Sequence, residues 1–115
     1  MWLLLLGCVT EANFGGKTAT LLCKRYAECD RGAFESTYSD VPDCVDENEP
    51  ALTDYYDCLA SECDFVAGKA AECLTGYRQE SCSDVSEGKT PSECEDVYDG
   101  CDDADYVACA IDAAF

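Results

Sequence analysis

Apolar residues recur along this chain at the spacing of amphipathic helices. From Ala19 to Cys29 they return every three or four positions, and the same period is repeated in four later segments. These segments are 52–63, 66–77, 94–101 and 102–113. No alternation with a period of two lasts long enough to predict a strand. The pattern therefore predicts an all-α fold, a small bundle of about five short helices.

Residues that commonly cap helices stand before these segments. Thr18 precedes the first segment, the run 48–50 opens the second, and Asp64 precedes the third. The strongest local signal is the run 90–93, in which threonine, proline and glutamate have the spacing of a capping box with proline at the first helical position. A last helix is expected to begin near Asp102. The two stretches around 33–34 and 41–45 predict short helices or connections.

The cysteine content is that of a disulfide scaffold. Eleven cysteines occur in 115 residues, a usage typical of small proteins from oxidising compartments. Ten of them are distributed over the predicted helical region, at Cys23, Cys29, Cys44, Cys58, Cys63, Cys73, Cys82, Cys94, Cys101 and Cys109. The closely spaced Cys pairs of zinc sites and of thioredoxin-like redox sites are missing. We therefore expect five disulfides, whose pairing the sequence leaves open among about 945 arrangements.

The remaining cysteine, Cys8, follows the run Leu3–Leu6 and Gly7. This stretch resembles the lipobox of bacterial lipoproteins, which implies that Cys8 receives a diacylglycerol and that residues 1–7 are a signal-peptide remnant that is cleaved. Lipidation would also explain the odd cysteine count. We expect residues 8–17 to be a tether and 18–115 to be the disulfide-stapled domain. An ordinary secretory remnant or a buried core segment remains an alternative for the apolar run.

Charge and composition exclude several classes of function. The net charge is −18, with 25 acidic and 7 basic residues, so nucleic acid and anionic lipid would both be repelled. The chain has no histidine, which rules out Ser-His-Asp and Cys-His catalytic sites. No motif indicates a cofactor or a catalytic residue, and the sequence predicts a protein that is not an enzyme.

One acidic cluster is a weak candidate for calcium. Asp99, Asp102, Asp103 and Asp105 lie close together around Gly100, and hard oxygen ligands at a turn can hold Ca²⁺. Their spacing does not match the EF-hand loop. The alternative is a solvated acidic face in which some of the carboxylates favour a helix N-terminus. We therefore assign no metal site from the sequence.

The run Cys23–Phe34, followed by Tyr38 and by Asp43–Val45, resembles small cysteine-rich lipoproteins of delta-proteobacteria, of the myxobacterial type. That family has no assigned activity, so the resemblance implies a location: the bacterial cell envelope, with a lipid anchor in the outer membrane, or secretion. We expect a non-catalytic binding or interaction module, held on the membrane through Cys8, with an unidentified protein or small-molecule partner. The alternatives are a secreted calcium-binding protein and a secreted enzyme or inhibitor with a carboxylate site.

Overall fold

The structure is a computed structural model that describes residues 8–113. Its elements are α2 (Glu11–Cys29), α3 (Arg31–Thr37), α4 (Val41–Glu62), β1 (Asp64–Phe65), α5 (Ala67–Gln79), α6 (Cys82–Ser86), the 3-10 turn η1 (Ser92–Cys94), β2 (Tyr98–Asp99) and α7 (Asp103–Asp112). The described part thus has six α-helices where the sequence predicted about five. The prediction of an all-α, disulfide-rich fold is confirmed.

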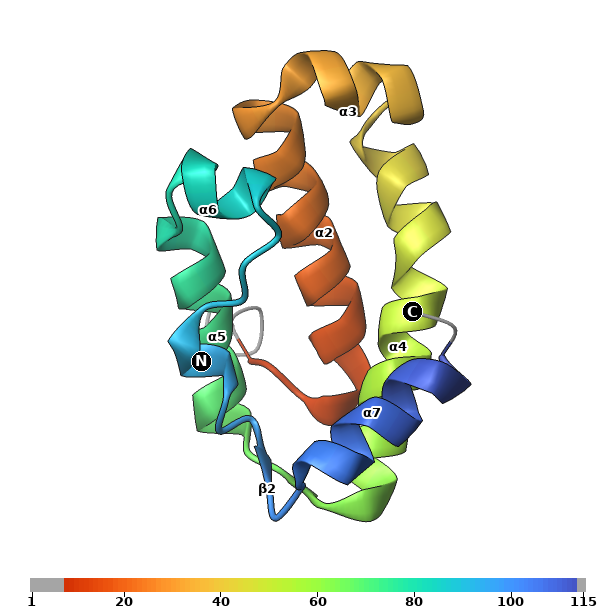
Figure 1. The fold of residues 1–115 in the computed structure, drawn as a ribbon, viewed down its shortest axis with the longest axis vertical. Helices are drawn as coiled ribbons and strands as arrows, with labels where there is room; N and C mark the ends of the chain where they lie inside the picture. Colours follow the sequence, from red (N-terminus) through yellow and green to blue (C-terminus); the bar gives the residue numbers. More distant parts are fainter. Residues whose placement is uncertain (1–7, 114–115) are drawn as a thin grey trace.

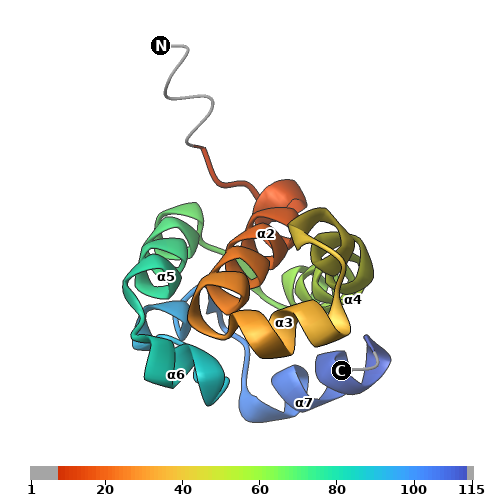
Figure 2. The ribbon, with the colours of Figure 1, turned by 90° about the horizontal axis from the view of Figure 1, so that it is seen from above.

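Helix α2 is the element around which the others are arranged. It runs between α5 and α4, and α3 returns the chain from the end of α2 to the start of α4 (Figure 1). Seen from above, α2, α4 and α5 lie toward one face of the molecule, and α6 and α7 lie toward the other (Figure 2). Residues 8–10 lead away from the domain on the α2 side.

Helix α2 begins eight residues earlier than the sequence indicated. Thr10 is its N-cap: the Thr10 side chain accepts a hydrogen bond from the Asn13 amide at 3.2 Å, and the Asn13 side chain accepts one from the Thr10 amide at 2.8 Å. Phe14 is 1% exposed and anchors this first part of the helix in the core. The prediction of a tether over residues 8–17 is therefore wrong from Glu11 onward, and Thr18 is a buried residue inside the helix.

Two adjacent glycines let α2 approach α4 closely. A Cβ at Gly15 would lie 2.6 Å from Oγ1 and 3.0 Å from Cα of Thr53, and the side chain of Glu49 occupies the space where a Cβ of Gly16 would be. At position 15 the contact includes the backbone of Thr53, so glycine is required there. At position 16 the contact is with the end of the Glu49 side chain, which can turn aside. The pair 15–16, which the sequence indicated as part of a flexible tether, is a helix-packing surface.

Helix α4 is one continuous helix, although the sequence predicted a new start at 48–50. Asp40 caps it, with its side chain accepting from the Asp43 amide at 2.8 Å, and Pro50 lies inside it. A proline removes one helical hydrogen bond and usually interrupts a helix. Here the disulfide from Cys44 to Cys23 holds the first half of α4 against α2, and the contact at Thr53 holds the second. Tertiary contacts thus hold α4 in place on both sides of Pro50.

The segment 90–101 is not the helix that its capping signal predicted. Only Ser92–Cys94 forms a 3-10 turn, and Pro91 precedes it without a side-chain cap. The chain then pairs in an antiparallel ladder with Phe65 opposite Tyr98, and the Val66 amide donates to the Val97 carbonyl at 2.8 Å. The disulfide of Cys94 and the close packing of Pro91 on Gly76 hold this segment to α5, so long-range contacts override the local signal.

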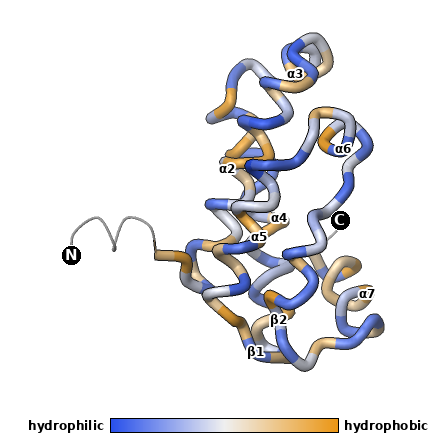
Figure 3. Tube along the Cα trace, turned by 90° about the vertical axis from the view of Figure 1, so that its left-hand side faces the viewer, coloured by the Kyte–Doolittle hydropathy of each residue, from blue (hydrophilic) through white to orange (hydrophobic). Residues whose placement is uncertain are grey.

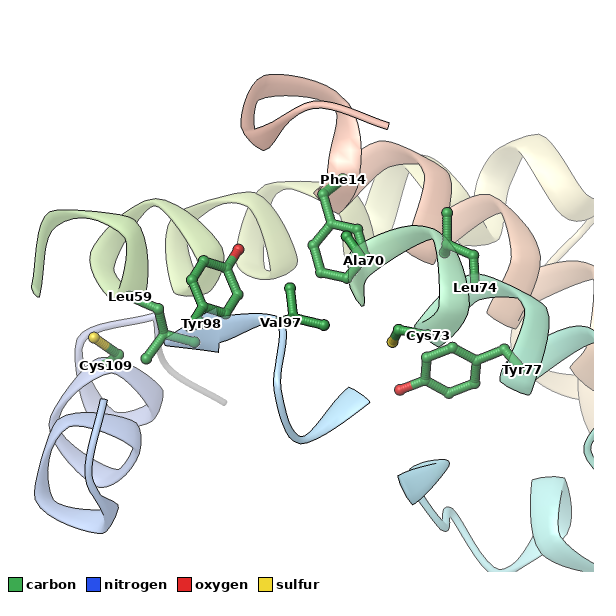
Figure 4. Close-up of a cluster of buried hydrophobic side chains, with 9 residues drawn as sticks. All are labelled: Phe14, Leu59, Ala70, Cys73, Leu74, Tyr77, Val97, Tyr98 and Cys109. Carbon is green, nitrogen blue, oxygen red and sulfur yellow. The ribbon is translucent and has the colours of Figure 1, made fainter. Parts of the chain in front are cut away.

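The main core lies where α2, α4, α5 and the β2 segment meet (Figure 4). Its buried members are Phe14, Leu59, Ala70, Cys73, Leu74, Tyr77, Val97, Tyr98 and Cys109. A second, smaller cluster packs Phe34 against the Cys23–Cys44 disulfide at the α3 end. Hydrophilic positions interrupt the hydrophobic ones along the helices (Figure 3). No helix within residues 8–113 combines the length and the hydropathy needed to cross a membrane.

Five disulfides connect the elements and confirm the expected scaffold. They join Cys23 to Cys44, Cys29 to Cys82, Cys58 to Cys109, Cys63 to Cys101, and Cys73 to Cys94. Every predicted disulfide cysteine is used, and Cys8 is exposed and takes no part in them. Each bridge links two different elements or their flanking residues. The network therefore ties the small second cluster, α6 and α7 to the main body.

Candidate functional site

Five of the seven tyrosines line one hollow, which we call the tyrosine cavity. It has a volume of about 670 Å³ and lies among α4, α5, α7 and the segment η1–β2. Its aromatic lining consists of Phe14, Tyr55, Tyr56, Tyr77, Tyr98 and Tyr106, and its aliphatic lining of Leu52, Leu59, Val97 and Ala110. Small-molecule sites are typically apolar hollows of roughly 300–1,000 Å³ with a few polar groups, and this one fits that description.

The fold brings the rings together from elements that are distant in sequence. Tyr55 and Tyr56 are neighbours on α4, whereas the pairing of Phe65 with Tyr98 fixes the ring of Tyr98 beside α4. Tyr56 and Tyr98 stack with centroids 5.9 Å apart and planes 19° apart, and Phe14 lies 4.5 Å from the ring of Tyr56. Stacked and tilted rings of this kind make a rigid wall.

The phenols of the cavity are neutral at physiological pH. Burial raises the pKa of all five tyrosines, which are Tyr55, Tyr56, Tyr77, Tyr98 and Tyr106. Each hydroxyl therefore keeps its proton and can donate a hydrogen bond. In Figure 4 the hydroxyl of Tyr77 turns toward the middle of the core cluster.

The hydroxyl of Tyr98 is buried without a hydrogen-bond partner among residues 8–113. The side chain is only 4% exposed. Burial is the main cause that raises the pKa of the Tyr98 hydroxyl, and the neighbouring Tyr56 and the carboxylates of Glu11 and Asp57 raise this pKa further. A buried polar group without a partner costs about 1–3 kcal/mol, so Tyr98, one of the lining residues, carries a hydroxyl that the described fold leaves unsatisfied.

Two carboxylates give the tyrosine cavity a negative charge. Glu95 and Asp103 line it, both exposed to solvent, and Asp103 is the first residue of α7. No lysine or arginine of the described residues lines this cavity. Aromatic faces and carboxylates both attract cations, so the lining favours a ligand with a positive charge and an apolar body.

A second pair of carboxyl groups lies outside the cavity, between α2 and α4. A hydrogen bond to the Asp57 side chain raises the pKa of Glu11, burial adds a smaller effect, and the charge of Asp57 contributes as well. The Glu11 carboxyl therefore keeps its proton to a higher pH than an isolated glutamate does. Neither residue lines the tyrosine cavity, but their carboxylates lie close enough to Tyr98 to raise the pKa of its hydroxyl.

The four aspartates proposed as a weak calcium site have other roles in the structure. Asp102 caps α7, accepting from the Asp105 amide at 2.9 Å, and Asp105 accepts from the Asp102 amide at 3.1 Å. Asp103 lines the tyrosine cavity, and Asp99 belongs to β2. Among the residues that the structure describes, no group of three or more Cys, Asp or Glu side chains is arranged to hold a metal ion.

The lipidation site predicted at Cys8 is at the edge of the described chain. Cys8 is exposed, two residues before the N-cap Thr10, and its carbonyl accepts a hydrogen bond from the Asn13 side chain at 3.3 Å. The predicted signal remnant 1–7 lies outside the described residues. Lipidation and cleavage remain predictions.

Comparison of the chain with models of known families, with curated proteins and with solved structures found no match. The candidate site is therefore interpreted from its own chemistry.

Most tyrosines fall on the apolar faces of the helices that the sequence predicts, but the sequence does not show that they converge. Tyr55, Tyr56, Tyr77 and Tyr106 lie on three different helices, and the sequence placed Tyr98 on a helix although it lies on β2. The available signal was compositional: seven tyrosines in a chain of 115 residues that has one tryptophan and four phenylalanines. Packing alone does not need the tyrosine hydroxyl. The use of tyrosine more often than phenylalanine was therefore a signal that the hydroxyl groups make polar contacts.

Proposed function

We propose that this protein is a lipid-anchored binding module of the bacterial cell envelope, and that its tyrosine cavity holds a small organic cation. The observation that carries the proposal is the convergence of five tyrosines and two carboxylates around one hollow of about 670 Å³. An apolar hollow with neutral phenols and negative charge fits an amine or quaternary ammonium group attached to an apolar body. The net charge of −18 would also attract a cation to the protein surface.

The disulfide network supports a binding role. It fixes α4, α5 and α7, the three helices that supply most of the cavity lining. A site held in this way is preorganised, and preorganisation lowers the conformational cost of binding. The Cys58–Cys109 bridge links α4 to α7 directly, and the Cys73–Cys94 bridge links α5 to the segment that carries Glu95.

The binding proposal is tested by calorimetric titration with benzyltrimethylammonium and with benzenesulfonate, which have similar aromatic bodies and opposite charges. We expect the cation to bind and the anion not to bind. Replacing Glu95 by glutamine should weaken binding of the cation about threefold to tenfold, because one of two nearby negative charges is lost. Tyr106→Leu should weaken it by a similar factor, because an aromatic face is removed.

The matched control is Glu47→Gln, which removes one exposed carboxylate of α4 outside the cavity. It should leave the affinity for benzyltrimethylammonium unchanged. Equal weakening by Glu47→Gln and Glu95→Gln would show that the cation is attracted only by the overall charge. Equal binding of benzenesulfonate and benzyltrimethylammonium would contradict the proposal as well.

The anchor is tested separately by the intact mass of the protein made in a bacterium that processes lipoproteins. We expect a diacylglycerol on Cys8 and ten alkylated cysteines that appear only after reduction. An unprocessed chain with an unmodified Cys8 would overturn the anchor and leave the binding proposal standing.

A further inference from the structure

A groove along α2 gathers basic side chains in a chain that is strongly acidic elsewhere. This basic groove, as we call it, lies between α2, α4 and α5 and has a volume of about 880 Å³. Lys17 and Lys24 of α2 and Arg78 of α5 line it, and these are three of the seven basic residues in the chain. Figure 1 shows α2 running between α5 and α4, the helices that form the two sides. The groove is distinct from the tyrosine cavity, and its lining shares no residue with it.

The three basic residues of the groove differ from the other four in their partners. The others form the ion pairs Arg25–Glu28, Arg31–Glu35, Lys69–Glu72, Lys89–Asp84 and Lys89–Glu87. Within residues 8–113, Lys17, Lys24 and Arg78 form no ion pair. The chain has 25 acidic residues, so a basic side chain finds an acidic partner easily unless the fold keeps acids away.

Glu49 is the one acidic residue among those described that line this groove, and it forms no ion pair with the three basic residues. One turn before and after Lys17 the helix presents Asn13 and Leu21, and Glu28, one turn after Lys24, is already paired with Arg25. Helix dipoles do not account for the two lysines, because α2 has no basic residue in its last turn. Cations gathered without partners repel one another, and a bound anion would remove that repulsion.

We propose that the basic groove binds a ligand that carries a phosphomonoester group. Three cations and the single carboxylate of Glu49 give the lining a formal charge of +2. A phosphomonoester carries about −1.5 to −2 at neutral pH, which complements this charge. Lys17 and Lys24 are seven residues apart, roughly 10 Å along the helix, so both side chains can reach one group lying between them. Arg78 approaches from α5 and offers the planar donor fork that suits phosphate oxygens.

The phosphomonoester has two conceivable sources, a soluble ester or a lipid headgroup. The groove begins at the first turn of α2, where Ala12 and Asn13 line it, next to the residues 8–10 that lead away from the domain (Figure 2). A headgroup would therefore be within reach if Cys8 is anchored in a membrane. The assignment of the groove itself does not depend on that anchor or on the tyrosine cavity.

The test uses the full chain with its disulfides and measures binding of glycerol 3-phosphate by calorimetry at low ionic strength. A parallel arm measures co-sedimentation with phosphatidylcholine vesicles that contain phosphatidate, against vesicles of phosphatidylcholine alone. Lys17→Gln, Lys24→Gln and Arg78→Gln should each weaken binding about fivefold to tenfold, because each removes one charged contact. Lys69→Gln is the matched control, since it removes a lysine of α5 that is already paired and lies outside the groove.

Binding of glycerol 3-phosphate that the groove variants weaken and Lys69→Gln leaves unchanged supports the site with a soluble ligand. Binding to phosphatidate vesicles alone, with the same variant pattern, supports the site with a headgroup as its ligand. Affinity in either arm should fall as the pH drops below about 6, where the phosphomonoester loses one negative charge. The proposal is overturned if neither probe binds, or if Lys69→Gln weakens binding as much as the groove variants do. Circular dichroism of each variant confirms that the fold is retained.

Discussion

Gly15 of α2 faces Thr53 of α4 so closely that a Cβ at position 15 would lie 2.6 Å from the threonine Oγ1 and 3.0 Å from its Cα. Because the second contact is with backbone, a rotamer change of Thr53 cannot relieve it. The position sets how closely the two longest helices of the described chain approach.

Gly15→Ala should therefore lower the free energy of unfolding by about 2 kcal/mol, the usual cost of overpacking a close contact. Gly68→Ala is the control, because Gly68 lies in α5 with open space around its Cα. That change should raise stability by roughly 0.5–1 kcal/mol through helix propensity. Urea unfolding of the two variants measures both values, and equal effects would show that the helices do not meet at Gly15.

Tyr98→Phe should stabilise the protein in the absence of ligand. The substitution keeps the ring that stacks on Tyr56 and removes a buried hydroxyl without a partner, so we expect a gain of about 1 kcal/mol. Tyr38→Phe is the opposite case, because the Tyr38 hydroxyl accepts a hydrogen bond from the Asn48 side chain at 3.0 Å. Tyr38→Phe should lower the free energy of unfolding by about 0.5–1.5 kcal/mol. Loss of stability in both variants would mean that Tyr98 finds a partner in solution.

The pair Glu11–Asp57 should make stability depend on pH. The hydrogen bond to Asp57 raises the pKa of Glu11 in the folded state above its usual value of 4.5. The stability that this hydrogen bond contributes is therefore fully present below the usual pKa of 4.5. It is lost as the pH rises through the pKa of Glu11 in the folded state. Glu11→Gln removes the repulsion between two carboxylates, so it should be more stable than the wild type at pH 7 and lose that advantage near pH 4.

Thermal unfolding at a series of pH values measures this difference. Glu47→Gln removes one exposed carboxylate elsewhere on α4 and reports the effect of overall charge alone. If both variants gain the same stability at pH 7, the effect belongs to the net charge and not to the pair.

Removing a disulfide should cost more where the bridged residues are farther apart in sequence. Cys58 and Cys109 are 51 positions apart, and Cys23 and Cys44 are 21 apart. Loop-closure entropy gives about 4 kcal/mol for the first bridge and about 3 kcal/mol for the second. Paired alanine substitutions at each bridge, compared by urea unfolding, check the order. A larger loss at Cys23–Cys44 would show that packing in the small second cluster outweighs chain entropy.

The sequence predicted the fold class and the use of its cysteines because those depend on local period and on composition. Asp40 caps α4 just before the stretch 41–45 that was expected to be a short helix or connection, and Asp102 caps the last helix where it was expected. The start of α2 was missed because residues 8–17 were expected to be a tether. A glycine pair such as Gly15–Gly16 looks the same in sequence whether it lies in a tether or at a helix crossing. The capping signal at Thr90 failed because its competitors, the Cys94 disulfide and the ladder at Tyr98, are long-range contacts.

Neither candidate site was foreseen, because both are produced by tertiary convergence. The lining of the tyrosine cavity comes from elements between α2 and α7, and Lys17 and Arg78 are brought to one groove across 61 positions of sequence. Local sequence records which faces of the helices are apolar or charged. It does not record which of those faces meet, and the pairing of ten cysteines was equally open at that stage.

The five disulfides close overlapping loops, which keeps the chain together when a protease cuts it once. The intervals that they close, 23–44, 29–82, 58–109, 63–101 and 73–94, overlap without a gap from Cys23 to Cys109. A single cut of the backbone anywhere in that range leaves the two halves joined by at least one bridge. A protease can thus cut the exposed stretch 86–90, and the two parts of the chain stay covalently joined. They separate only when the disulfides are reduced.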